Sequence, residues 1–110
     1  MANTAKIEAL LTLDNHRWCS EYLGSDHPYQ DGVREADVRL VESFAYHNGL
    51  GRCFRFSDPD GHCIVWFTKS ERDVQVGQTF RVSFVIQSHR EFNGVRENIT
   101  KNFRILAVYK

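Results

Sequence analysis

The stretch RCFRFSDPDGHCIVWFTK, residues 52–69, decides the fold that this sequence predicts. It places two apolar, alternating segments on either side of Asp58-Pro59-Asp60-Gly61, a run typical of a tight turn. The arrangement returns further along the chain, where residues 79–88 and 95–109 flank Asn93-Gly94. Residues 52–110 therefore predict short antiparallel strands in a small curled sheet, with almost no helical pattern among them.

The first half of the chain adds one strand and a helical segment to this prediction. Residues 36–46 alternate imperfectly between polar and apolar, and we expect them to form the first strand. Ile7 and Leu11 lie at helical spacing, and an apolar stripe continues as far as Leu23. Residues 4–23 therefore predict one helix or two short ones.

Length and composition limit the class of protein. A chain of 110 residues holds one modest core, and a hydrophobic content of 42% is typical of a globular protein. No apolar run approaches the ~20 residues that cross a bilayer. We expect a cytoplasmic protein with a single domain over 1–110. A helical segment, 4–23, would precede a mainly β, five-stranded barrel over 33–110.

The three cysteines are an odd number, which argues against a disulfide framework. A turn of four residues over 58–61 predicts that Cys53 faces Trp66 and that Phe56 faces Cys63. The two thiols would then lie on opposite faces, and we expect all three cysteines to be reduced. In the same register a core face and an outer face alternate along both strands. The core face would hold Phe54, Phe56, Cys63, Val65 and Phe67, and the outer face Cys53, Arg55, Ser57, His62, Ile64 and Trp66.

The order of the motifs resembles an OB-fold-like nucleic-acid-binding module of phage and plasmid proteins. The residues that carry the resemblance are Gly51-Arg-Cys-Phe-Arg-Phe-Ser-Asp58-Pro-Asp-Gly61, Val65-Trp66-Phe67, Gly77 and His89-Arg-Glu-Phe92-Asn-Gly94-Val95. The chain departs from that module at Arg96-Glu97-Asn98, where the module usually continues with Gln-Thr and a basic residue. The resemblance implies a partly open OB-like barrel that binds oligonucleotides on strands 2 and 3. It also implies a phage or mobile-element origin, a role in replication or recombination, and the host cytoplasm as location.

Seven residues are candidates for contacts with single-stranded nucleic acid. An outward Trp66 would stack on a base beside Arg55, and the final hairpin would present several guanidinium groups and one aromatic ring to the backbone. Two alternatives remain open: the N-terminal helix covers Trp66, or the arginines only keep exposed strand edges from pairing. The candidates are Arg55, Trp66, Arg81, Arg90, Phe92, Arg96 and Arg104.

The charge balance keeps a second class of function open. The net charge is zero, with −4 over residues 1–77 and +4 over residues 78–110, whereas dedicated nucleic-acid binders are usually basic. The alternative is a small phage-type interaction module or inhibitor that docks on a host protein complex such as a defence nuclease. A third interpretation is an oligomer formed through the edge of the last strand, where Leu106 and Val108 accompany Arg104.

The sequence predicts no catalysis, no cofactor and no metal. Gly-x-Ser-x-Gly, Walker and His-Glu-x-x-His motifs are absent from the sequence. His16-x-x-Cys19 and His62-Cys63 lack a second ligand pair at zinc spacing. Asp58-Pro-Asp-Gly61 is explained as a turn, because the ligands of a calcium loop do not follow it.

Overall fold

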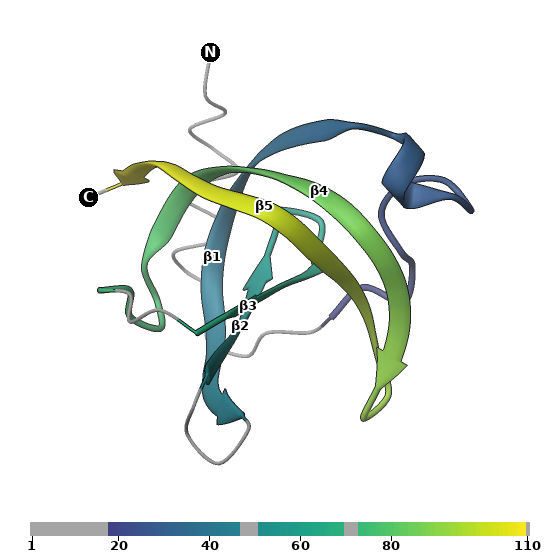
Figure 1. The fold of residues 1–110 in the computed structure, drawn as a ribbon. Coiled ribbons are helices and arrows are strands. Elements are labelled where there is room, and N and C mark those ends of the chain that lie inside the picture. The colour runs from purple at the N-terminus through teal and green to yellow at the C-terminus, as the bar shows by residue number, and fades with distance from the viewer. Residues whose placement is uncertain (1–17, 47–50, 70–72, 110) are drawn as a thin grey trace.

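Five strands follow one another along the chain and close into a barrel in the computed structural model, which describes residues 18–46, 51–69 and 73–109 (Figure 1). A short 3₁₀ turn, η1, precedes the first strand. The elements are η1 (Pro28–Gln30), β1 (Val33–Tyr46), β2 (Gly51–Ser57), β3 (Cys63–Thr68), β4 (Thr79–Phe92) and β5 (Val95–Tyr109). The predicted five-stranded, mainly β architecture is confirmed.

The strands are arranged in the order β1-β2-β3-β5-β4, and β4 pairs with β1. All neighbours are antiparallel except β3 and β5, which pair in parallel from Cys63 to Val65. This short parallel pair closes the ring, whereas we expected a partly open barrel. β1 pairs with two strands: its first half pairs with β4 and its second half with β2. The register of the pairing with β2 shifts between Leu40 and Glu42.

The predicted N-terminal helix is wrong over residues 18–23, and residues 4–17 lie outside the described residues. Residues 18–23 are irregular, and two of their backbone N–H groups donate to acceptors far away in the sequence. Cys19 N donates to the carbonyl of Gly61 at 2.8 Å, and Leu23 N donates to Asn98 Oδ1 at 2.8 Å. Within the described residues, no helix has the length and apolar character needed to cross a membrane.

Alternation along the strands fills the barrel interior with aromatic and aliphatic side chains. The interior cluster consists of Val38, Leu40, Phe54, Phe56, Ile64, Trp66, Phe80, Val82, Phe84 and Ile86. Phe103 of β5 stacks inside this cluster on Phe56 at 5.1 Å and on Trp66 at 4.5 Å between ring centroids. The clean alternation of residues 79–88 in the sequence is thus the signature of one strand of the barrel wall.

The register of β2 and β3 differs by one residue from the predicted one. Ser57 pairs with Cys63 and Phe54 pairs with Trp66, because the loop between the strands has five residues rather than four. A shift of one residue moves every side chain of a strand to the other face. Trp66 and Ile64 therefore point into the barrel, and Cys63, Val65 and Phe67 point outward, which corrects the predicted faces of β3.

A second apolar cluster lies outside the barrel wall. Cys53, Cys63 and Val65 form its buried centre, and Trp18, Tyr46, Phe67, Val95 and Ile99 pack around them. The far ends of β4 and β5 extend beyond the ring as a hairpin with a two-residue turn, which is the light-green loop at the lower right of Figure 1. Asn93 and Gly94 both have positive φ in this turn, at 51° and 77°, as a type I′ hairpin requires.

Candidate functional site

Aromatic side chains gather on the outside of β1, β2 and β3, next to the β4–β5 hairpin. Phe44 pairs with Cys53, and Cys53 pairs with Phe67, so these three side chains point outward in one row across the sheet. The ring of Tyr46 meets the edge of Phe67 with centroids 5.3 Å apart. We call Phe44, Tyr46, Phe67 and Phe92 the aromatic face.

A close backbone approach holds the ring of Tyr46 in this position. Tyr46 pairs with Gly51 at the start of β2. A Cβ atom on Gly51 would lie 2.4 Å from two ring carbons of Tyr46. Only glycine leaves room for the ring at this point, so Gly51 helps to shape the aromatic face.

Arg90 joins the hairpin to the aromatic face. Its guanidinium carbon lies 5.3 Å from the centroid of Phe67 and 5.1 Å from that of Phe92, within the range of cation–π contacts. The guanidinium carbon of Arg55 lies 5.8 Å from the ring of Phe92. The side chain of Phe92 is 44% exposed and that of Phe44 is 38% exposed, so both rings remain open to a ligand.

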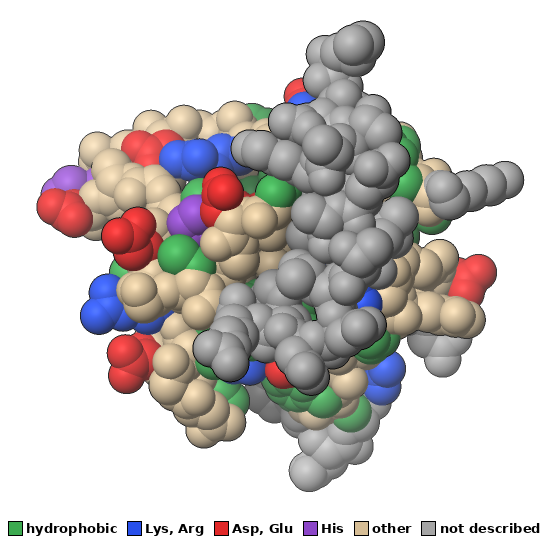
Figure 2. Space-filling model, turned by 180° about the vertical axis from the view of Figure 1, so that it is seen from behind, with side chains coloured by type: hydrophobic (Ala, Val, Ile, Leu, Met, Phe, Trp, Pro, Cys, Tyr) green, Lys and Arg blue, Asp and Glu red, His purple; other side chains and the backbone are tan. Residues whose placement is uncertain are grey.

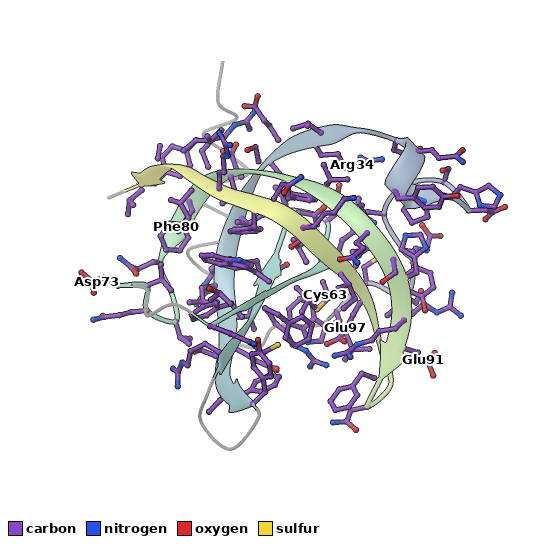
Figure 3. The ribbon with its side chains drawn as sticks, viewed as in Figure 1. Arg34, Cys63, Asp73, Phe80, Glu91 and Glu97 are labelled. Atoms are coloured by element: carbon purple, nitrogen blue, oxygen red, sulfur yellow. The ribbon has the colours of Figure 1, made fainter. Side chains whose placement is uncertain are left out.

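Both arginines are neutralised by buried or half-buried carboxylates. Glu97 has no exposed surface, and its Oε2 lies 2.6 Å from Arg55 while its Oε1 lies 2.5 Å from Arg90 Nε. Arg55 Nη1 also lies 3.1 Å from Glu42 Oε2. Figure 3 places Glu97 next to Cys63, where β5 runs beside β3. The two positive and two negative charges of this ion-pair network cancel.

The pKa of Arg55 reflects this balance. Burial of the guanidinium by itself lowers the pKa, but the hydrogen bond and the charge of Glu97 outweigh it, so the pKa is raised. Arg55 therefore stays charged inside the wall and binds Glu97. It also donates to the backbone carbonyl of Phe92 at 3.4 Å, which ties the end of the hairpin to β2.

The structure brings three of the seven predicted contact residues together: Arg55, Arg90 and Phe92. Arg96 belongs to the same hairpin, where its guanidinium carbon lies 5.5 Å from the ring of Tyr22. Its Nε lies 3.9 Å from Glu91 Oε1, an exposed ion pair. Because side chains alternate along a strand, Arg96 and its partner Glu91 lie on the opposite side of the hairpin from Phe92, so Arg96 is not part of the aromatic face.

The other three predicted residues lie elsewhere. The expected position of Trp66 on the outer face beside Arg55 is wrong, since its ring is 9% exposed and stacks on Phe103 inside the barrel. Arg81 lies on the outside of β4 within 3.4 Å of Asp37 and 3.5 Å of Glu35. Arg104 lies on β5 opposite Ser83.

The charges of residues 1–77 and 78–110, −4 and +4 in the sequence, are interleaved in the folded chain. Arg81 of the basic half of the sequence pairs with Asp37 of the acidic half, and Arg55 of the acidic half pairs with Glu97 of the basic half. Figure 2 shows acidic and basic side chains intermingled over the described part of the rear surface. Strand pairing therefore cancels the charge asymmetry of the sequence locally.

Sequence reasoning missed the roles of Phe44, Tyr46, Phe67, Glu42 and Glu97. Phe44-x-Tyr46 has the alternate spacing that places two rings on one strand face, a signal that was available. Phe67 was assigned to the core by the one-residue register error. No sequence pattern indicated the role of Glu97, because its burial depends on side chains of β2 and β4 that come close to it only in the folded barrel.

The two buried cysteines lie on the same outward side, not on opposite faces as predicted. Burial raises the pKa of Cys53 to about 11, and burial also raises the pKa of Cys63. All three cysteines of the described residues are free, and the two buried thiols are protonated near neutral pH. They act here as small apolar groups beneath the aromatic face.

The loop between β2 and β3 holds the one group of potential metal ligands within the described ranges. Ligand atoms of Asp58, Asp60 and His62 lie within 4.8 Å of one another. Asp58 Oδ1 accepts hydrogen bonds from the backbone N–H groups of Asp60 and His62, at 3.0 and 2.8 Å. Asp58 Oδ2 lies 2.8 Å from His62 Nδ1. These contacts account for the loop conformation without an ion.

The aromatic face is therefore identified as the candidate site from its geometry alone. Comparison with protein families, curated proteins and solved structures finds no match to this chain.

Proposed function

We propose that this protein binds single-stranded nucleic acid on the aromatic face, without catalysis and with little sequence preference. The observation that carries the proposal is the position of the Arg90 guanidinium beside the rings of Phe67 and Phe92, with Phe92 open to solvent. Flat aromatic and guanidinium surfaces are what unpaired bases stack on, at about 1–3 kcal/mol per base.

The arrangement of the strands also supports the proposal. A five-stranded ring in the order β1-β2-β3-β5-β4 with a parallel β3–β5 pair fits an OB-like barrel. OB-folds bind oligonucleotides on strands 2 and 3 and on the loop between strands 4 and 5. Phe67 of β3 and the β4–β5 hairpin with Arg90 and Phe92 occupy the corresponding places. A role in phage replication or recombination belongs to the same proposal.

The ion-pair network determines what kind of binding to expect. Glu97 and Glu42 compensate Arg55 and Arg90, so stacking contributes more to affinity than phosphate neutralisation. If only one or two cations contact phosphates, affinity falls only about threefold to sevenfold between ~50 and ~200 mM salt. A strongly basic binder would lose orders of magnitude over that range.

The charge cancellation also favours a second candidate function, a protein-interaction module. Exposed rings in a neutral setting are typical of protein interfaces, in which aromatic residues are enriched and charged ones depleted. A host protein complex, such as a defence nuclease, would then be the partner of the aromatic face. Both candidate functions use Phe92 and Phe44, so only the identity of the bound ligand distinguishes them.

Fluorescence anisotropy with labelled poly-dT and poly-rU oligonucleotides at both salt concentrations tests the first candidate. We expect saturable binding that Phe92→Ala and Phe44→Ala each weaken by about fivefold or more. Tyr29→Ala is the matched control, because Tyr29 is an exposed aromatic in η1, near the opposite end of β1 from Phe44.

Two outcomes would contradict nucleic-acid binding. One is the absence of oligonucleotide binding at ~50 mM salt. The other is equal affinity for the wild type and the two face variants. If a host protein is instead retained by the wild type and lost with Phe92→Ala, the second candidate replaces the first.

A further inference from the structure

The second half of β5 has a strand partner on one side only. β3 pairs with β5 from Cys63 to Val65 opposite Glu97 to Ile99, and this pairing goes no further. Beyond it, β5 continues to Tyr109 alongside β4, and no described strand pairs with its other edge. In Figure 1 this half of β5 crosses the front of the barrel with β4 on one side. An edge of this kind offers backbone N–H and C=O groups to an added strand.

A cavity opens where β3 and β5 diverge. It has a volume of about 380 Å³ and is lined by Trp66, Phe103, Arg104 and Ile105. The Trp66 and Phe103 rings are stacked 4.5 Å apart, so the cavity has an aromatic wall. Its size accommodates one large apolar side chain, which is how a strand-binding edge selects its ligand.

The charge of the edge is positive and uncompensated. Residues 101–109 include Lys101 and Arg104 but no Asp or Glu. Within the described ranges, no carboxylate forms an ion pair with either side chain. This distinguishes them from Arg55, Arg81, Arg90 and Arg96, each of which has a carboxylate partner. Leu106 and Val108 are 49% and 51% exposed along the same segment.

We propose that the free edge of β5 binds an extended, acidic segment of a partner protein. The segment adds as a strand along residues 101–109, places carboxylates near Lys101 and Arg104, and inserts one apolar side chain into the cavity beside Trp66. Charge complementarity is the argument for an acidic occupant rather than a second copy of this chain. Two copies paired through this edge would bring cations together and contribute no acid from residues 101–109.

This site is separate from the aromatic face and does not depend on nucleic-acid binding. Phe92 and Arg90 lie on the outward side of the β2–β3 wall and the hairpin, whereas the cavity faces Trp66 and Phe103. Failure of one proposal therefore leaves the other intact, and Phe92→Ala should not change the affinity for an acidic peptide.

A pair of synthetic nine-residue peptides tests the proposal with the full chain. Both alternate Val with a charged residue around a central Phe; one carries Glu and the other Lys at the charged positions. We expect the Glu peptide to bind and to protect backbone amides within residues 101–109 from hydrogen exchange. Arg104→Glu and Lys101→Glu should each weaken its binding by about fivefold to tenfold. Arg96→Glu is the matched control and should leave it unchanged, because Arg96 is an exposed arginine at the other end of β5.

Four outcomes would overturn the proposal. The Glu peptide does not bind, the Lys peptide binds equally well, or protection appears outside residues 101–109. The fourth is protection of these amides that rises with protein concentration in the absence of peptide, which would assign the edge to a second copy. Because both substituted cations are exposed, the variants should keep the fold, and far-UV circular dichroism verifies this.

Discussion

The side chains of Arg55 and Glu97 meet at 2.6 Å inside the outer wall of the barrel, although 42 residues separate them along the chain. The pair connects β2 to β5 at the base of the β4–β5 hairpin. Arg90 binds the second oxygen of Glu97 from the hairpin itself. This carboxylate therefore sets the position of the hairpin, and with it that of Phe92, relative to β2 and β3.

Substitution of Glu97 should strongly destabilise the fold. Glu97→Ala leaves Arg55 without its buried partner, and we expect the free energy of unfolding in urea to fall by about 3–5 kcal/mol. Glu91→Ala is the control, because Glu91 is exposed and forms only a 3.9 Å contact with Arg96. Its effect should stay within about 0.5 kcal/mol.

A combined variant separates the cost of an unpaired charge from the loss of a contact. Arg55→Met with Glu97→Leu removes both buried charges, so it should recover much of the stability lost in Glu97→Ala. If the two changes are instead additive, the pair does not interact as the geometry indicates.

Trp66 should matter for stability and not for oligonucleotide affinity. Trp66→Ala empties the space around Phe54 and Phe103, at a cost of about 3–5 kcal/mol in unfolding free energy. Trp66→Phe keeps most of the volume and should bind an oligonucleotide as the wild type does. Phe67→Ala should show the opposite pattern, with weaker binding at a smaller cost in stability. A loss of affinity in the folded Trp66→Phe variant would contradict this assignment.

Gly51→Ala should distort the aromatic face. The added methyl group would overlap the ring of Tyr46, which must move away from Phe67, and we expect a loss of about 1–3 kcal/mol in unfolding free energy. Repeating the change in a Tyr46→Ala background is the control. With the ring removed, Gly51→Ala should cost clearly less; an unchanged cost would mean that the ring does not cause the strain.

The buried thiols should make stability depend on alkaline pH. Burial raises the pKa of Cys53 from its ordinary value of 9.0 to about 11. Between these values the unfolded chain releases the proton first, so the free energy of unfolding falls as pH rises from 9 to 11. Urea denaturation over this range should show the decline. Cys53→Ala should make it shallower, and the slope that remains comes from Cys63, whose pKa burial also raises.

Thiol labelling offers an independent check of the same burial. At pH 8 the native protein should react with a disulfide reagent at Cys19, which is partly exposed, and only slowly at Cys53 and Cys63. In urea all three should react quickly. Fast labelling of all three thiols in the native state would contradict the burial of the outer cluster.

The strands were predictable from the sequence because each carries its own local signal. Alternation and tight turns predict strands at the places where β2, β3, β4 and β5 lie, and β5 has the predicted bounds. The faces of β3 were not predictable in the same way. They depend on whether the loop after Ser57 takes four residues or five, and the Asp58 carboxylate decides this by binding the N–H groups of Asp60 and His62.

The candidate site was predictable only in part. Arg90 and Phe92 lie in one hairpin, and their proximity follows from its Asn93-Gly94 turn. The position of Glu97 depends on its contact with Arg55 of β2, and no local sequence pattern predicts a contact between residues so far apart in the chain. The irregular path of residues 18–23 has the same origin, since Leu23 takes its partner from Asn98, 75 residues away.

The division of β1 between two partners has a consequence for how the chain folds. Val33 pairs with Val85, so the first half of β1 has no strand to join until β4 has left the ribosome. The second half can already form a hairpin with β2. Closing such distant pairs is slow, and folding on the millisecond-to-second scale is expected for a barrel of this kind. During synthesis, the stretch Val33–Arg39 therefore stays without its strand partner until Thr79–Val85 has emerged, and over that interval it is available to a chaperone or a neighbouring nascent chain.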